Sequence, residues 1–67
     1  MVRTFARREA QVIQGLWDGL SQAQVADRLG IAYGTVKVVM RNAKLRANVT
    51  RTISLMRVAA RQGVLKP

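Results

Sequence analysis

The apolar residues of this chain recur at intervals of three and four positions in four separate stretches. Residues with that spacing lie on one face of an α-helix. The pattern predicts helices over about residues 6–18, 21–29, 34–46 and 51–62. Because no linker separates these stretches, we expect one all-α domain that spans residues 1–67.

The first predicted helix carries an apolar stripe made of Phe5, Val12, Ile13, Leu16, Trp17 and Leu20. A large aromatic residue on such a face usually belongs to the core, so we assign Trp17 to the core and not to a surface that stacks on bases. Thr4 is the nearest side chain that can cap the start of this helix. Gly19 suits the left-handed backbone that ends many helices.

A short second helix and a turn come before the third helix. Ser21 and Gln24 have the spacing of a capping box, which predicts the start of the second helix. Gly30 suits its left-handed end, and we expect Ile31 in the turn to plug the core. A short helix, a tight turn and a longer helix in this order are typical of a helix-turn-helix unit.

The third predicted helix has a dry side and a basic side. The dry side consists of Val36, Val39 or Met40, and Ala43. The other side consists of Lys37, Val38, Arg41, Asn42, Lys44 and Leu45, none of which is acidic. Such a helix is suited to pack on a core with one face and to meet phosphates and base edges with the other, although Leu45 has no evident role.

The fourth predicted helix has more apolar positions than a thin core needs. Asn48 can close the third helix, and Thr50 or Thr52 can cap the fourth. The apolar positions of the fourth helix are Ile53, Leu55, Met56, Ala59 and Ala60. Two interpretations stay open: the stripe covers only the first and third helices, or part of it binds a partner.

The charge of the chain favours a polyanionic partner. Its formal net charge is +9, and no acidic residue follows Asp27. Double-stranded DNA is the leading candidate because binding releases its condensed counterions, and an acidic membrane surface is the competitor. No apolar run approaches the roughly 20 residues needed to span a bilayer, and the start of the chain lacks a secretory signal. We therefore expect a cytoplasmic, nucleoid-associated protein.

Residue types that serve catalysis or metal binding are scarce. The chain has no Cys and no His, and its only carboxylates, Glu9, Asp18 and Asp27, are widely spaced. We therefore expect no enzymatic activity, no metal, no cofactor and no small-molecule ligand. Without cysteines no disulfide supports so short a chain, which makes dimerisation a reasonable source of further buried area.

These features resemble the LuxR/GerE-type DNA-binding domain, a four-helix helix-turn-helix module of bacterial response regulators and quorum sensors. The likeness covers residues 5–65 without a gap. The matching motifs, in order, are Arg8-Glu9, Val12-Ile13, Gly19-Leu20-Ser21, Val25-Ala26, Leu29-Gly30-Ile31, Thr35-Val36-Lys37, Asn42, Val49, Leu55, Ala59 and Gly63. An ordered series of this kind is far more specific than a bare helix-turn-helix pattern.

The resemblance implies a role for each helix. The third helix enters the major groove, the second braces it across the DNA backbone, and the fourth forms the dimer contact. The implied base-reading residues are Lys37, Val38 and Arg41, with Tyr33 and Gly34 at the leading end of the helix. The implied contacts to the DNA backbone are Ser21, Gln22, Thr35, Lys44 and Arg46. The implied dimer interface consists of Ile53, Met56 and Ala60.

The chain departs from the family pattern in several places. Val39 stands where the family usually has His, so we expect packing there instead of a polar contact. Ala32 replaces the usual Ser or Thr cap of the third helix and Gly34 follows in its first turn, so we expect DNA to order this start. Arg51-Thr52 stands where Ser-Arg is common, so we expect a different local cap there.

Three hypotheses about function follow. The first is a sequence-specific, homodimeric transcription regulator of bacterial or phage type, a repressor or autorepressor that reads an inverted repeat. Because no receiver or ligand-binding domain precedes the module, we expect a short stand-alone member controlled by its concentration or by a partner. The second is an adaptor bound to RNA polymerase, or a DNA-binding module like sigma region 4 or that of a recombinase. The third is a cationic amphipathic peptide that acts on membranes, against which the internal caps and glycines argue.

Overall fold

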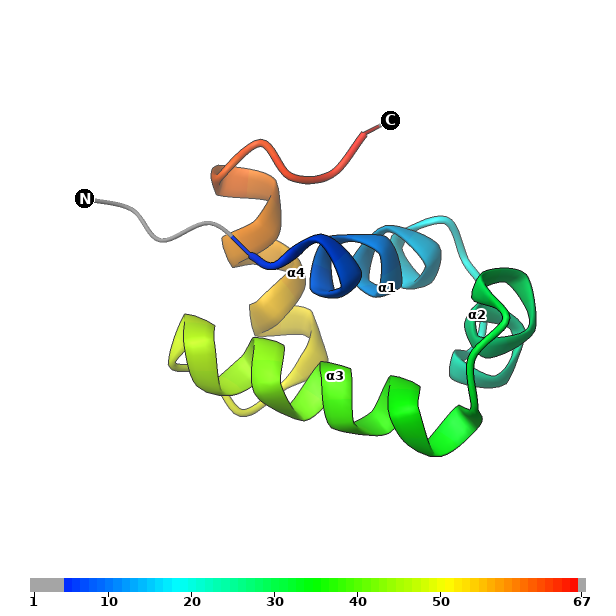
Figure 1. Ribbon diagram of the computed structural model, residues 1–67. Helices are drawn as coiled ribbons and strands as arrows, with labels where there is room; N and C mark the ends of the chain where they lie inside the picture. The colour runs from blue at the N-terminus through cyan, green and yellow to red at the C-terminus, as the bar shows by residue number, and fades with distance from the viewer. Residues whose placement is uncertain (1–4, 67) are drawn as a thin grey trace.

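The computed structural model describes residues 5–66 and contains four helices in that range. They are α1 (Arg7–Trp17), α2 (Gln22–Leu29), α3 (Tyr33–Ala47) and α4 (Thr52–Arg61) (Figure 1). No strand is present in this part of the chain, so the predicted all-α, four-helix class is confirmed.

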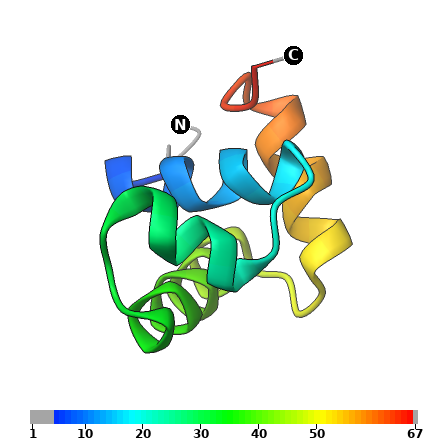
Figure 2. The same cartoon turned by 90° about the vertical axis from the view of Figure 1, so that its right-hand side faces the viewer.

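Helices α1 and α3 form the centre of the arrangement, because each of them contacts the three other helices. Figure 1 shows α1 above α3, with α2 at the right of the two helices and α4 toward their left. In the perpendicular view of Figure 2, α1 and α3 run in different directions. Helix α3 lies on the side of the molecule away from the C-terminal end (Figure 1). The longest helix therefore has one face on the core and one face toward the surroundings.

The core takes residues from all four helices and from the segment before α1. Its buried apolar members are Phe5, Val12, Ile13, Val25, Ala26, Val36, Met40, Ala43, Leu55 and Ala59. The predicted dry side of α3 is confirmed in Val36 and Ala43, and of the two alternatives Met40 is the buried one while Val39 is half-buried. Ile31 of the turn also packs against this core from a half-buried position, as predicted.

The capping residues of α2 fix where this helix begins and ends. The Ser21 hydroxyl accepts from the Gln24 backbone N–H at 3.1 Å, and the Gln24 side chain accepts from the Ser21 N–H at 2.8 Å, which confirms the predicted capping box. The helix ends at Gly30 with φ 69°, a left-handed conformation that suits glycine. The turn from Gly30 to Ala32 then sets the direction of α3.

The assignment of Trp17 to the core is wrong, because its side chain is 51% exposed. The buried residues of α1 are Glu9, Val12, Ile13 and Gly15, and Leu16 packs against the core from a half-buried position. Trp17 follows Ile13 by four residues, so it lies on the flank of the buried face. Spacing alone could not separate the centre of the stripe from its edge.

The cap predicted for α4 is also wrong. Its N-cap residue is Arg51, whose side chain makes no capping hydrogen bond, and Thr52 is the first helical residue. Arg51 is extended (φ −109°, ψ 146°), which places Thr50 one residue too early to cap. The predicted cap of α1, Thr4, lies outside the described residues, and Ala6 is the N-cap there.

Gly15 allows α1 and α2 to approach closely. A Cβ added at Gly15 would lie 2.7 Å from Cγ2 of the fully buried Val25, and a valine methyl in a packed core has little freedom to move. We expect Gly15→Ala to lower the free energy of unfolding by about 1–2 kcal/mol, because the cost of overpacking exceeds the gain in helix propensity. Urea denaturation measures this change, and an increase in stability would contradict the packing argument.

Candidate nucleic-acid interface

The outward side of α3 is a continuous exposed surface. Its exposed residues are Tyr33, Gly34, Thr35, Lys37, Val38, Arg41, Asn42, Leu45 and Arg46. The helix is positioned by its inward residues, which are sealed in the core, and its last carbonyl groups are followed by Asn48 in a left-handed conformation with φ 58°. The predicted left-handed end at Asn48 is thus confirmed. All five residues expected to face bases are exposed, and none is hidden by the fold.

A hollow of about 370 Å³ brings residues of α2, α3 and the α3–α4 loop together. It is lined by Gln22, Lys37, Met40, Arg41, Lys44, Leu45, Val49 and Thr50. Two residues expected to read bases, Lys37 and Arg41, therefore share one concave surface with two residues expected to bind the DNA backbone, Gln22 and Lys44. The hollow has three cationic side chains and no acidic one, which makes it suited to a phosphate-bearing strand.

Sequence reasoning missed two residues of this hollow. Leu45, for which no role was evident, is 69% exposed and lines the hollow beside Lys44. Thr50 lines it from the loop after α3 and has a hydroxyl that can donate to a phosphate oxygen. The end of the helix at Asn48 could be predicted, but the direction that the chain takes after it, which puts Thr50 beside the cationic face of α3, could not.

At the leading end of α3, Lys37 lies over the ring of Tyr33. The Lys37 Nζ atom is 5.5 Å from the centre of the Tyr33 ring, a cation–π distance, and the two residues are one helical turn apart. Both side chains are exposed, so the contact biases the lysine rotamer without burying its charge. The ammonium group therefore has a preferred position before any ligand arrives.

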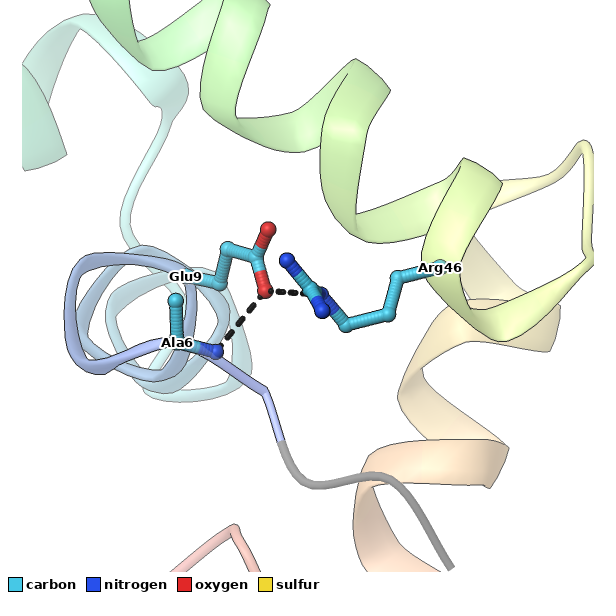
Figure 3. Close-up of polar contacts among 3 residues, drawn as sticks. All are labelled: Ala6, Glu9 and Arg46. Atoms are coloured by element: carbon cyan, nitrogen blue, oxygen red, sulfur yellow. Dashed lines mark hydrogen bonds and ion pairs between the residues drawn. The ribbon is translucent and has the colours of Figure 1, made fainter.

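Arg46 lies apart from the other cations of α3 because it pairs with an acid of α1. Its Nε donates to Glu9 Oε1 at 2.9 Å, and the same oxygen accepts from the Ala6 backbone N–H at 2.9 Å (Figure 3). The side chain of Glu9 is 7% exposed and that of Arg46 is 33% exposed. This pair joins the start of α1 to the end of α3.

The remaining predicted contact residues fall into two places. Ser21 and Thr35 are both exposed, and each lies at the start of a helix of the helix-turn-helix unit. On α4, Ile53 is 62% exposed and Ala60 is exposed, whereas Met56 is half-buried against the core. The residues expected to contact DNA and those expected to form the dimer therefore lie on different helices.

A comparison with protein families identifies the kind of module that presents this surface. Residues 3–59 match the family model GerE, described as bacterial regulatory proteins of the luxR family. The chain belongs to this family. The match covers most of the chain, and the resemblance expected from its motifs is confirmed. No curated protein matches the chain significantly.

As a LuxR-family domain, the chain is a DNA-binding helix-turn-helix module of a transcription regulator, and DNA is its partner. The helix-turn-helix unit formed by α2 and α3 carries the cationic hollow. Within the described residues no group of three or more His, Cys, Asp or Glu could hold a metal ion. No helix of residues 5–66 is long and apolar enough to cross a membrane.

Proposed function

We propose that this LuxR-family domain is a sequence-specific repressor or autorepressor that binds an inverted repeat as a homodimer, in the cytoplasm and on the nucleoid. The observation that carries the proposal is the hollow, in which Lys37, Arg41 and Lys44 of α3 face the same space as Gln22 of α2. Such a surface can follow one DNA strand while the helix enters the major groove.

The proposed contacts divide between bases and phosphates. Lys37 and Arg41 bind guanine O6 and N7, and the exposed Val38 meets a thymine methyl group. Tyr33 and Gly34 approach bases at the leading end of the helix. The residues proposed to bind phosphates are Ser21, Gln22, Thr35, Lys44 and Thr50. Arg46 differs from these because Glu9 already engages its Nε, so we propose that it mainly supports the fold.

The proposed dimer forms through the outward stripe of α4. Ile53 and Ala60 are exposed on this helix and Met56 is partly covered, which leaves a small apolar surface. Arg57 follows Ile53 by four residues and is exposed on the same side, and α4 has no acidic residue to pair with it. Two approaching copies therefore bring like charges together, so we expect the dimer to assemble on DNA, whose phosphates offset the repulsion.

We expect Ile53→Ser to leave the folded monomer intact, because the side chain is exposed, and to weaken pairing on DNA, because it removes apolar surface without adding a charge. On an inverted repeat the variant should bind as independent monomers, with a loss of cooperative binding on the order of 10-fold or more. Gel-shift titration of one-site and two-site duplexes measures this directly. Trp17→Ser, a change of an exposed apolar side chain on α1, serves as the control. Unchanged cooperativity in the Ile53 variant would place the dimer contact elsewhere.

Selection of binding sites from random duplexes tests the proposed function as a whole. We expect an inverted repeat whose half-sites are centred about 10 base pairs apart, since two α3 helices must reach successive turns of the groove. Enrichment of a single half-site would contradict the proposal that the protein binds DNA as a dimer. If no sequence is enriched and the protein co-purifies with RNA polymerase, the result would favour a polymerase-bound adaptor over a sequence-specific regulator.

The membrane-active hypothesis has a separate test. A cationic amphipathic peptide is largely unstructured in buffer and gains helix on anionic vesicles. The buried core described above predicts instead a cooperative thermal transition in the absence of lipid. Circular dichroism with and without anionic vesicles distinguishes the two.

A further inference from the structure

Gly34 is the glycine that the fold does not explain. Of the five glycines, Gly19, Gly30 and Gly63 have positive φ angles, and Gly15 lies against Val25. At Gly34 the backbone is helical and its φ is not positive. A Cβ added there would meet no heavy atom within 4 Å among the residues that the structure describes. Packing and backbone conformation therefore both permit an alanine at this position.

A glycine here also weakens the helix to which it belongs. Glycine has a lower helix propensity than alanine, and the preceding N-cap, Ala32, makes no side-chain capping bond. The leading end of α3 thus has two residues that contribute little to its stability. The stability of the folded protein would therefore be greater with alanine than with glycine at position 34.

The position of Gly34 on the helix suggests that contact with another molecule requires the glycine. Gly34 is exposed, and it precedes Lys37 by three residues and Val38 by four, so all three lie on one side of α3. The surface is bare peptide backbone at this point, one turn ahead of two proposed base-reading side chains. Glycine is commonly found where another molecule approaches the backbone closely.

We propose that Gly34 is the point at which DNA comes nearest to the backbone of α3, and that its missing side chain sets how deeply this end of the helix enters the major groove. The inference rests on the proposed function. A methyl group at this position would hold the leading end of the helix away from the base pairs. Lys37 and Val38, one turn behind it, would then lose reach to the base edges.

The test compares Gly34→Ala with the unmodified chain in thermal unfolding and in binding to two duplexes, one enriched by the site selection and one of random sequence. We expect the melting temperature to rise by about 2–6 °C, because the substitution reduces the entropy of the unfolded chain at an unstrained site. We expect affinity for the selected duplex to fall about 10-fold or more, and affinity for the random duplex to change less than about twofold.

Gly15→Ala is the matched control, since it adds the same methyl group at a position where the fold, and not DNA, requires glycine. It should lower the melting temperature and leave the affinity of the folded protein for the selected duplex unchanged. Full affinity of Gly34→Ala for that duplex, or a lower melting temperature of this variant, would overturn the inference. If the unmodified chain does not distinguish the two duplexes, the proposed function fails before any variant is compared.

Discussion

Replacing Arg41 with alanine should remove sequence discrimination at one base pair of each half-site. Arg41 is exposed and lines the cationic hollow, and in the part of the chain that the structure describes the only ion pair joins Glu9 to Arg46. Its guanidinium is therefore available to make two hydrogen bonds to guanine. Such a contact contributes about 1–3 kcal/mol of discrimination, so the preferred base should lose roughly a 5- to 140-fold advantage.

Competition binding with every single-base variant of the selected site measures this effect. The matched control is Lys44→Ala, which removes a cation from the same hollow at a position proposed to bind phosphate. It should weaken all sequences alike and reduce the slope of log affinity against log salt by about one. If Arg41→Ala also weakens all sequences equally, Arg41 binds the DNA backbone and the base contact belongs to another residue.

The helices could be predicted from the chain because their signals are local. The three- and four-residue spacing of apolar positions, the capping box at Ser21 and the left-handed ends at Gly30 and Asn48 each depend on neighbours within one helical turn. The same locality explains the exposed face of α3, since residues opposite a buried stripe must face outward. Features that depend only on residues within one helical turn can therefore be predicted from the sequence.

The wrong cap of α4 is a local error of one residue, whereas the other errors lie where the outcome depends on a distant part of the chain. Trp17 has helical spacing that fits the core, but burial depends on which side of α1 the other helices cover. The hollow joins Gln22 to residues of α3 and to Thr50 after it, so no local pattern could show that they share one surface. Which residues from distant parts of the chain share a surface can be seen only in the three-dimensional structure.

Arg46 is the clearest case of a side chain whose partner its own segment could not show. Its basic character and its position near the end of the third helix favoured a phosphate contact, whereas its partner lies 37 residues earlier in the chain. The signal that could have found the pair is Glu9, an acid on the apolar face of a helix between Phe5 and Val12. An acid on such a face needs a cation nearby, because an unpaired buried charge is costly.

Replacing Arg46 with methionine should lower the free energy of unfolding by about 2–4 kcal/mol, a large share of the stability of so small a domain. The variant leaves the Glu9 carboxylate, whose side chain is 7% exposed, with the Ala6 N–H as its remaining donor. Glu9→Leu should cost less, because the Arg46 side chain that it leaves behind is 33% exposed and can turn to water. Urea denaturation of both variants measures this asymmetry.

The double variant Glu9→Leu, Arg46→Met shows whether the ion pair adds net stability or whether the attraction between its charges only offsets the cost of their desolvation. Because the desolvation of both charges is then removed together, we expect it to recover most of the loss. The hydrogen bond from the Ala6 N–H to Glu9 stays lost, so the double variant should be about 1 kcal/mol less stable than the unmodified chain. Lys44→Met, a neighbouring change on α3 with no ion pair, should leave stability nearly unchanged. Equal losses in the two single variants, with no recovery in the double one, would mean that the side chains act separately and that the bond in Figure 3 does not join α1 to α3.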